Sequence, residues 1–298
     1  MAKSEMLRGA MTALITPFRD GAVDEEALRE LVDRQIGDGI DGLVPCGTTG
    51  ESATMSAQER LDVIRAVAEQ VNGRVPVIAG TGTNDTRATI DFTNEVSRIR
   101  GVDAALVVVP YYNKPGPKML QAHFEHVANA SELPVVLYNV PGRTVVSLTA
   151  SAVASLATHP DVIGIKEATG DLKFAAELHE AVGEQDFAFM SGDDFTTMPF
   201  VAMGGHGCIS VLSNIMPGTM STLVARAAGG DLEEARALNV RIQALTRALF
   251  ARSNPVPTKA LASALGWCSP EVRAPLFEAE PEFIQELHEV FSAYNDLM

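Results

Sequence analysis

The sequence predicts an α/β fold, namely a (β/α)8 TIM barrel with a C-terminal helical extension. About eight short apolar runs recur with starts roughly 20 to 35 residues apart, the length that one strand, one helix and two loops occupy. Most of these runs are apolar at consecutive positions, as in 106–109 (LVVV), which is typical of parallel strands buried on both faces. A doubly wound open sheet would show the same alternation and remains the alternative.

The expected elements follow one another along the chain. Strands are predicted at 11–16, 42–47, 75–82, 104–112, 134–140, 162–167, 187–192 and 208–211. The first helix follows Asp24 with an apolar stripe at 28, 31, 32 and 36, and the second follows a capping box at 56–59 (SAQE). Segment 230–298 has helical runs at 232–251, 258–265 and 281–294. We therefore expect a catalytic barrel over 1–229 and a helical extension over 230–298 packed on it.

The composition argues against several classes of partner. The 298 residues include 38 acidic and 23 basic side chains, and the net charge of −15 repels nucleic acid and anionic membrane surfaces. No apolar run approaches the roughly 18 to 20 residues that span a bilayer. The opening residues do not resemble a secretory signal, so we expect a cytoplasmic protein. The three cysteines are far apart and fit neither a disulfide framework nor a zinc site, and Cys46 and Cys208 are expected to be buried.

Lys166 is the candidate nucleophile. It is the only one of six lysines inside an apolar strand run, 162–166 (VIGIK). Alternation along the strand turns Ile163 and Ile165 to one side, and Gly164 and Lys166 into the barrel. An inward amine is costly unless it is paired or neutral, and a neutral amine is the form that attacks a carbonyl to give a Schiff base. A buried ion pair is the alternative, although Glu167 should point to the opposite face.

Other polar groups are expected at the same end of the barrel. Tyr138 ends the neighbouring strand, where its hydroxyl could move protons or simply anchor the rim. Arg143 follows a Pro-Gly turn and either binds a carboxylate over the mouth or is solvated. The loop 47–52 (GTTGES) offers amides and hydroxyls to an anion. His123 and His126 have no acidic partner at metal-ligand spacing, and we interpret them as a solvated helix face.

A set of motifs then resembles a known family. They are 47–51 (GTTGE), 110–113 (PYYN), 138–144 (YNVPGRT), 164–170 (GIKEATG), 191–193 (SGD) and 254–257 (NPVP). Together they are similar to those of the dihydrodipicolinate synthases, which belong to the pyruvate-dependent class I aldolases with N-acetylneuraminate lyase. The similarity runs in order from about Gly9 to the C-terminal helices.

The resemblance implies a barrel enzyme that condenses pyruvate with aspartate 4-semialdehyde in lysine and diaminopimelate biosynthesis. It implies the following site: Lys166 forms the imine, Tyr138, Thr48 and Tyr112 relay protons, Thr49 holds the pyruvate carboxylate, Arg143 binds the second substrate, and Ile209 and Gly192 lie beside the pyruvate. No metal or organic cofactor is implied, because the lysine imine is itself the electron sink.

The resemblance also concerns assembly and regulation. It implies a homotetramer built as a dimer of dimers, in which Tyr112 reaches into the partner's site; adjacent exposed aromatic residues at 111–112 are typical of an interface. Lysine-inhibited members carry two histidines and a glutamate where this chain has Ala57, Arg60 and Ala88, so feedback by lysine is predicted to be weak or absent.

Two other functions remain in competition. Within the superfamily, the alternative is an aldolase or lyase for a sugar acid, although Arg143 suits a carboxylate better than a polyol. From another class, a non-catalytic barrel that binds a small acid would have no use for an inward, unpaired amine at Lys166.

Overall fold

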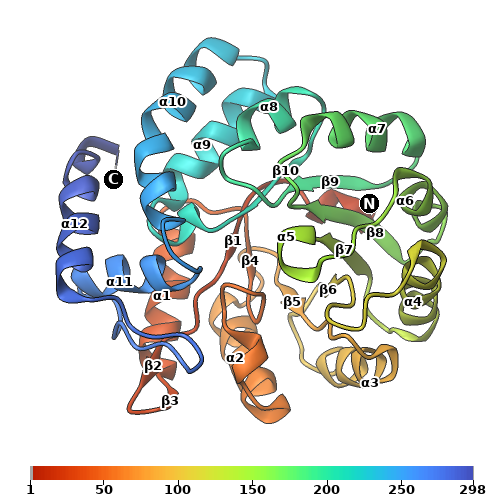
Figure 1. The fold of residues 1–298 in the computed structure, drawn as a ribbon, viewed down its shortest axis with the longest axis horizontal. Coiled ribbons are helices and arrows are strands. Elements are labelled where there is room, and N and C mark those ends of the chain that lie inside the picture. The colour runs from red at the N-terminus through yellow and green to blue at the C-terminus, as the bar shows by residue number, and fades with distance from the viewer. Residues whose placement is uncertain (1–2, 298) are drawn as a thin grey trace.

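A ring of parallel strands surrounded by helices forms the body of the protein (Figure 1). The computed structural model describes residues 3–297. The strands are β1 (Gly9–Ala13), β4 (Gly42–Val44), β5 (Ile78–Gly80), β6 (Ala104–Val108), β7 (Val135–Asn139), β8 (Val162–Glu167), β9 (Ala188–Ser191) and β10 (Gly207–Ser210), paired in the order β4-β1-β10-β9-β8-β7-β6-β5. An isolated parallel bridge, Leu43 to Val77, and a hydrogen bond from the Gly80 amide to the Pro45 carbonyl connect the β4 side to the β5 side. The predicted barrel is therefore confirmed.

The helices lie outside the strands, as the alternating sequence predicts. They are α1 (Glu25–Gly37), α2 (Ala57–Val71), α3 (Thr86–Val96), α4 (Pro117–Ala130), α6 (Ala150–Ala157), α7 (Leu172–Val182), α8 (Thr197–Ala202) and α9 (Pro217–Ala228). The predicted caps are present: Asp24 accepts from the amide of Ala27, and Ser56 and Glu59 form a capping box. A small hairpin, β2 (Phe18–Arg19) and β3 (Ala22–Val23), was not predicted.

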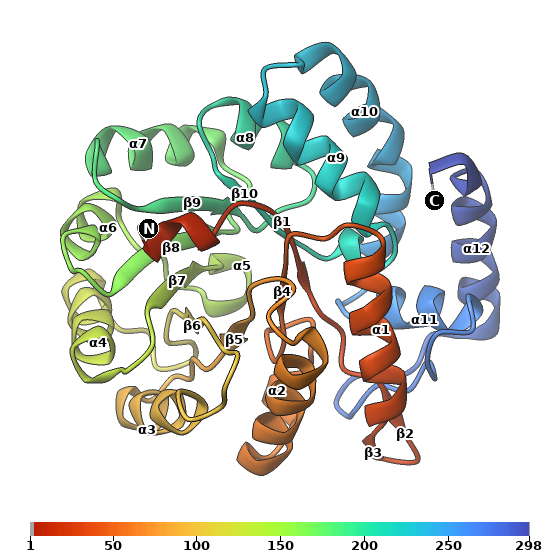
Figure 2. The same cartoon turned by 180° about the vertical axis from the view of Figure 1, so that it is seen from behind.

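Two short helices mark the two ends of the barrel. The helical turn α5 (Pro141–Thr144) lies at the mouth, where the parallel strands end (Figure 1). The 3-10 turn η1 (Lys3–Met6) crosses the opposite end (Figure 2). None of the helices within 3–297 is long and apolar enough to cross a membrane.

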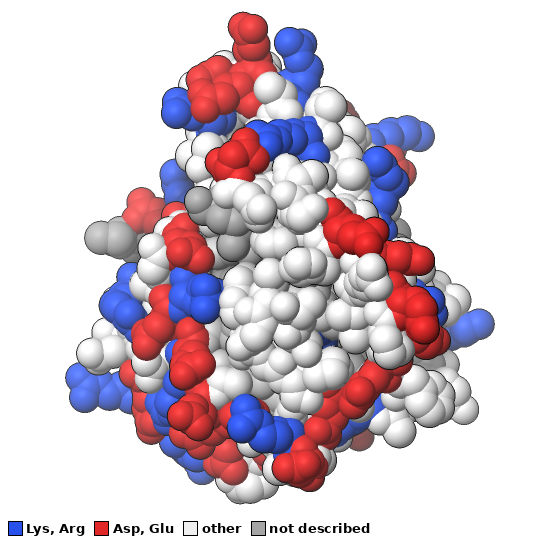
Figure 3. Space-filling model, turned by 90° about the vertical axis from the view of Figure 1, so that its left-hand side faces the viewer, with Lys and Arg blue, Asp and Glu red and all other residues white. Residues whose placement is uncertain are grey.

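The C-terminal helices pack beside the barrel as predicted. They are α10 (Leu232–Leu249), α11 (Val256–Ala264) and α12 (Pro281–Ser292), and α10 packs on α9 while α11 and α12 pack on each other. The side of the molecule that carries them shows a broad uncharged area bordered by acidic and basic side chains (Figure 3).

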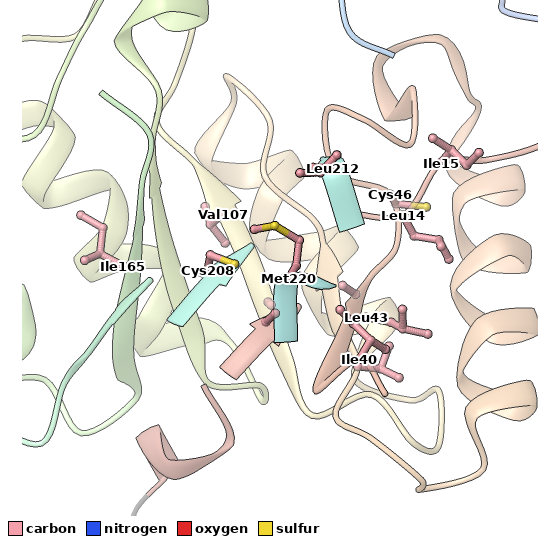
Figure 4. Packing of buried hydrophobic residues seen from close by; sticks show 14 of the residues in the cluster. Leu14, Ile15, Ile40, Leu43, Cys46, Val107, Ile165, Cys208, Leu212 and Met220 are labelled. Atoms are coloured by element: carbon pink, nitrogen blue, oxygen red, sulfur yellow. The ribbon is translucent and has the colours of Figure 1, made fainter. Parts of the chain in front are cut away.

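Two apolar clusters hold the barrel together. One, which includes Met11, Val44, Leu106 and Tyr138, takes alternate strand positions and fills the barrel interior. The larger one lies between strands and helices, where Cys208 of β10 sits beside Met220 of α9 (Figure 4). The burial predicted for Cys46 and Cys208 is confirmed, and burial raises the pKa of Cys46 to about 12, which keeps it a thiol.

Two local predictions are wrong. The register between β7 and β8 shifts at Val135/Val136, and Ile163 joins the interior cluster instead of facing outward with Ile165, because the irregularity breaks the alternation. His123 is only 4% exposed, not solvated: its Nδ1 bonds to the Thr86 hydroxyl at 2.9 Å, and burial lowers its pKa to about 4. Its neighbour on the helix, His126, is exposed as predicted.

Candidate active site

Lys166 and Tyr138 lie together at the ends of neighbouring strands. They are register partners on β8 and β7, and Lys166 Nζ lies 4.5 Å from the centroid of the Tyr138 ring. Lys166 is 5% exposed, and no carboxylate oxygen within residues 3–297 lies within 4.0 Å of its Nζ. The amine is therefore held against an aromatic face without an acidic partner.

Glu167, the nearest acid in sequence, is engaged on the other side of the strand. Its Oε2 accepts from Asn139 Nδ2 at 2.8 Å and its Oε1 accepts from the Thr169 amide at 2.6 Å. Burial raises the pKa of this carboxyl, while the two donors act in the opposite direction. Glu167 thus ties the end of β8 to the end of β7 and leaves Lys166 unpaired.

Glycine at 192 makes room for the lysine side chain. A Cβ at Gly192 would stand 2.9 Å from Lys166 Cε and 2.7 Å from the Ala168 Cβ, so a larger residue would displace the amine. Ile209 on β10 belongs to the same interior cluster as the Tyr138 ring. Gly192 thus lies against Lys166, and Ile209 shares the barrel interior with Tyr138.

The loop after β4 brings two threonines to this end of the barrel. Thr48 lines a cavity of about 40 Å³ together with Tyr138 and Val108. The loop approaches β5 closely, because a Cβ at Gly80 would stand only 2.2 Å from the carbonyl oxygen of Cys46. Thr49 is buried beside Asn254 of the C-terminal segment, whose Nδ2 donates to Thr49 Oγ1 at 2.9 Å.

A wider cavity, about 230 Å³, opens from Thr48 toward the surface. Arg143 on α5 is exposed at its rim, and Tyr111 forms another part of the wall. Arg60 of α2 also lines it but is only 9% exposed: its Nη2 donates to the Gly80 carbonyl at 2.9 Å, and burial lowers the pKa of the guanidinium. The cavity thus carries two guanidinium groups, which suits anionic ligands.

The larger hollow at the opposite end of the barrel has different chemistry. It measures about 540 Å³ and is lined by Arg8, Asp41, His206 and Ser221 among others, with neither lysine nor tyrosine in its wall. Within residues 3–297, no group of three or more metal-ligating side chains is gathered at one place. Tyr138, whose ring lies against the Lys166 amine, lines one of the smaller cavities at the mouth, so these cavities are the candidate active site.

Comparison with known proteins decides the family. The model of the Dihydrodipicolinate synthetase family matches residues 6–294. A 4-hydroxy-tetrahydrodipicolinate synthase of Geobacter sp. strain M21 is 50% identical over 290 residues, which cover 97% of this chain and 99% of that relative. The chain belongs to the dihydrodipicolinate synthetase family. The resemblance inferred from the motifs is therefore confirmed.

Solved structures of the family share the whole fold. The dihydrodipicolinate synthase of Aquifex aeolicus aligns with a TM-score of 0.94 at 40% identity, covering 97% of this chain and 98% of that one. A chloride-inhibited dihydrodipicolinate synthase of Acinetobacter baumannii, complexed with pyruvate, aligns with a TM-score of 0.93 at 40% identity, covering 96% and 98%.

One residue that the family resemblance assigns to the site is not brought there within a single subunit. Tyr112 is 90% exposed and has a left-handed backbone with φ of 72°, beyond the end of β6 at Val108. The predicted strand ran on to Tyr112, but the β6 hydrogen bonding stops short of Pro110, which has no N–H to donate.

A second buried lysine escaped the sequence analysis. Lys259 is 0% exposed on α11 and its Nζ lies 2.5 Å from Glu51 Oε1 in the loop after β4. Nζ also donates to the Glu271 carbonyl at 2.7 Å and lies 4.0 Å from the Phe18 ring centroid. The signal was present in the apolar run 256–262 (VPTKALA), where a lysine needs a buried partner. Its pairing with Glu51 distinguishes it from Lys166.

Proposed function

We propose that this chain is a 4-hydroxy-tetrahydrodipicolinate synthase that condenses pyruvate with aspartate 4-semialdehyde through a Schiff base on Lys166. The observation that carries the proposal is the buried Lys166 amine, which has no acidic partner among residues 3–297 and lies against Tyr138. Relatives about 50% identical over nearly the whole chain bear this enzyme's name, and one solved structure of the family contains pyruvate. The chain is thus an enzyme of the lyase class.

The chemistry starts from the free amine. Lys166 Nζ attacks the ketone carbon of pyruvate, and the ketone oxygen leaves as water to give the imine. Loss of a proton from the methyl group gives an enamine, and its terminal carbon forms the new bond to the aldehyde carbon. The imine accepts the electron pair of that deprotonation, so the residues of the site need supply only proton transfer and binding.

The family resemblance implies the roles of the remaining site residues, and the positions of Tyr138, Thr48 and Arg143 support them. Tyr138 stands beside the lysine, and Thr48 lines the same small cavity, so these two hydroxyls form the relay with Tyr112. Thr49 binds the pyruvate carboxylate. Arg143 at the rim binds the carboxylate of the aldehyde substrate.

Gly192 and Ile209 complete the pyruvate side of the site. Gly192 makes room for the lysine stem, and Ile209 presents its backbone carbonyl near the bound pyruvate. Substitution of Gly192 by alanine would place a methyl group against that stem and should weaken pyruvate binding.

A substrate assay tests the proposal against its alternative. Purified enzyme should consume pyruvate only when aspartate 4-semialdehyde is added, and it should leave N-acetylneuraminate uncleaved. Cleavage of a sugar acid without turnover of aspartate 4-semialdehyde would assign the chain to the other branch of the superfamily. Lys166→Ala provides the inactive control.

We extend the proposal to a homotetramer of two dimers, in which Tyr112 enters the partner's site. The support is the exposure of Tyr112 and of Tyr111, the residue before it, which lines the cavity. Mixing Tyr112→Phe subunits with Lys166→Ala subunits should restore partial activity, because one site of a mixed dimer then has both groups. Mixed dimers that form and stay inactive would place Tyr112 in its own chain's site or in a structural role.

Two further statements belong to the proposal. The division into a barrel over 1–229 and an extension over 230–298 is supported by the end of α9 at Ala228 and the start of α10 at Leu232. A cytoplasmic location agrees with the unpaired state of Cys46, Cys208 and Cys268. Limited proteolysis near residue 230 and cell fractionation test the two statements.

A further inference from the structure

A buried hydrogen bond joins the C-terminal extension to Thr49, the residue proposed above to bind the pyruvate carboxylate and called here the pyruvate subsite. Asn254 lies just before α11 and is 205 residues away from Thr49 in sequence, yet its Nδ2 donates to Thr49 Oγ1 at 2.9 Å. Both side chains are buried. A threonine hydroxyl has one proton to donate and two lone pairs, so the proton of Thr49 remains free when a lone pair is taken by the amide.

We propose that Asn254 is a positioning residue that makes Thr49 a hydrogen-bond donor toward the pyruvate carboxylate. This inference rests on the proposed function, which places that carboxylate at Thr49. The Asn254 amide presents an N–H to the hydroxyl oxygen, so the hydroxyl proton turns away from Asn254 and toward the substrate. A donor fixed in this way before the anion arrives binds it better than a freely rotating hydroxyl.

Within residues 3–297, the hydrogen bond to Thr49 is the one that the Asn254 side chain makes. Its Oδ1 is buried and has no partner within that range. A buried amide with one unpaired end is costly, and here the end that is paired is the donor. A change at this position is therefore transmitted through Thr49.

The same extension holds the loop at a second point, two residues further on. Glu51 has a left-handed backbone with φ of 54°, and its carboxylate binds Lys259 Nζ at 2.5 Å and the Arg273 amide at 2.9 Å. With Asn254, these contacts fix the loop that carries Thr48 and Thr49 from the side opposite the barrel. The extension thus contributes to the pyruvate subsite in addition to packing against the barrel.

Asn254→Asp tests the direction of the hydrogen bond. An ionised aspartate can only accept, so the Thr49 proton would turn toward it and be lost to pyruvate, and a negative charge would face the carboxylate. The pyruvate concentration needed for half-maximal borohydride trapping, without the second substrate, should rise roughly tenfold or more, while the KM for aspartate 4-semialdehyde stays near the wild-type value. An unchanged pyruvate dependence would mean that Thr49 donates to residue 254, and would overturn the inference.

A double-mutant cycle covers the case in which the aspartate variant does not fold. Asn254→Ala should raise the half-saturating pyruvate concentration roughly two- to tenfold in the wild-type background. In a Thr49→Val background the same substitution should have no further effect, because the group that it acts through is gone. A full effect in that background would show that Asn254 acts by another route.

A matched control separates positioning from damage to the helix. Thr258 lies on α11, is fully buried, and its hydroxyl has no partner within 3–297, so Thr258→Val changes the same region without touching Thr49. Its pyruvate dependence should equal that of the wild type, and a shift like that of Asn254→Ala would contradict the inference. If wild-type enzyme itself gives no pyruvate adduct on Lys166, the proposed function fails first, so the two failures are distinguishable.

Discussion

Replacing Lys259 with methionine removes one half of a buried ion pair and leaves the other half in place. The Glu51 side chain is almost fully enclosed, and without the ammonium its carboxylate keeps the Arg273 amide as its donor at 2.9 Å. Methionine keeps an unbranched side chain of similar length, but it also removes the contact of Nζ with the Phe18 ring, whose centroid lies 4.0 Å away. Breaking a buried pair from one side costs about 3 to 5 kcal/mol of unfolding free energy.

The double variant Glu51→Gln/Lys259→Met isolates the electrostatic part. Glutamine carries no charge and can still accept from the Arg273 amide, so the double variant should lie within about 2 kcal/mol of the wild type. Urea unfolding followed by fluorescence of Trp267, the one tryptophan, measures each variant at a fixed protein concentration. A loss below about 1 kcal/mol in Lys259→Met, or a double variant as unstable as the single one, would refute the reasoning.

Three further predictions follow from the cavity and from α4. Arg143→Ala should raise the KM for aspartate 4-semialdehyde about ten- to a hundred-fold without impairing imine formation, because it removes charge-assisted hydrogen bonds of roughly 1.5 to 3 kcal/mol. Loss of the pyruvate adduct in this variant would give Arg143 another role. Lysine should not inhibit at sub-millimolar concentrations, because Ala57 and Ala88 offer its amines no acceptor and the buried cation Arg60 repels them; potent inhibition in the substrate assay would contradict this. The His123 ring should titrate near pH 4 by NMR. Because the same ring in the unfolded chain binds its proton near pH 6.5, the free energy of unfolding should fall as the pH drops from about 6.5 to 4. A ring that titrates near pH 6.5 in the folded protein would refute its burial.

The sequence predicts the barrel because its signal repeats. Each βα unit carries the same pattern, so an error in one run does not change the fold, and the strand 162–167 is placed at its observed bounds. Strand ends are less well predicted, because apolar residues continue past the last hydrogen bond of the ladder, which on this strand is donated by the Val109 amide to the Tyr138 carbonyl. The irregularity at Ile163 arises from the pairing of β8 with β7, so the sequence around Ile163 alone does not predict it.

The candidate site likewise has residues that the local sequence predicts and residues that only the folded chain brings together. Lys166 is predictable from its own strand, because an amine in an apolar run is unusual. The Lys259 to Glu51 pair and the Asn254 to Thr49 bond join residues 208 and 205 positions apart, so only the folded chain brings them together. The prediction that His123 is solvated is wrong because a helix sequence does not distinguish an exposed histidine from a buried one. The partner that allows its burial, Thr86, is on the neighbouring helix α3.

Borohydride reduction in the presence of pyruvate tests the central claim most directly. Lys259 and Lys166 are both buried, but in the described part of the chain Lys259 is held by Glu51 while Lys166 has no acidic partner. The reduced three-carbon adduct should therefore appear on the peptide that contains Lys166. Peptide mass spectrometry of the wild type and of Lys166→Ala, each with and without pyruvate, locates it. An adduct confined to Lys166 and dependent on pyruvate is the expected result. An adduct on Lys259, or none at all, would contradict the assignment of Lys166 as the Schiff-base lysine.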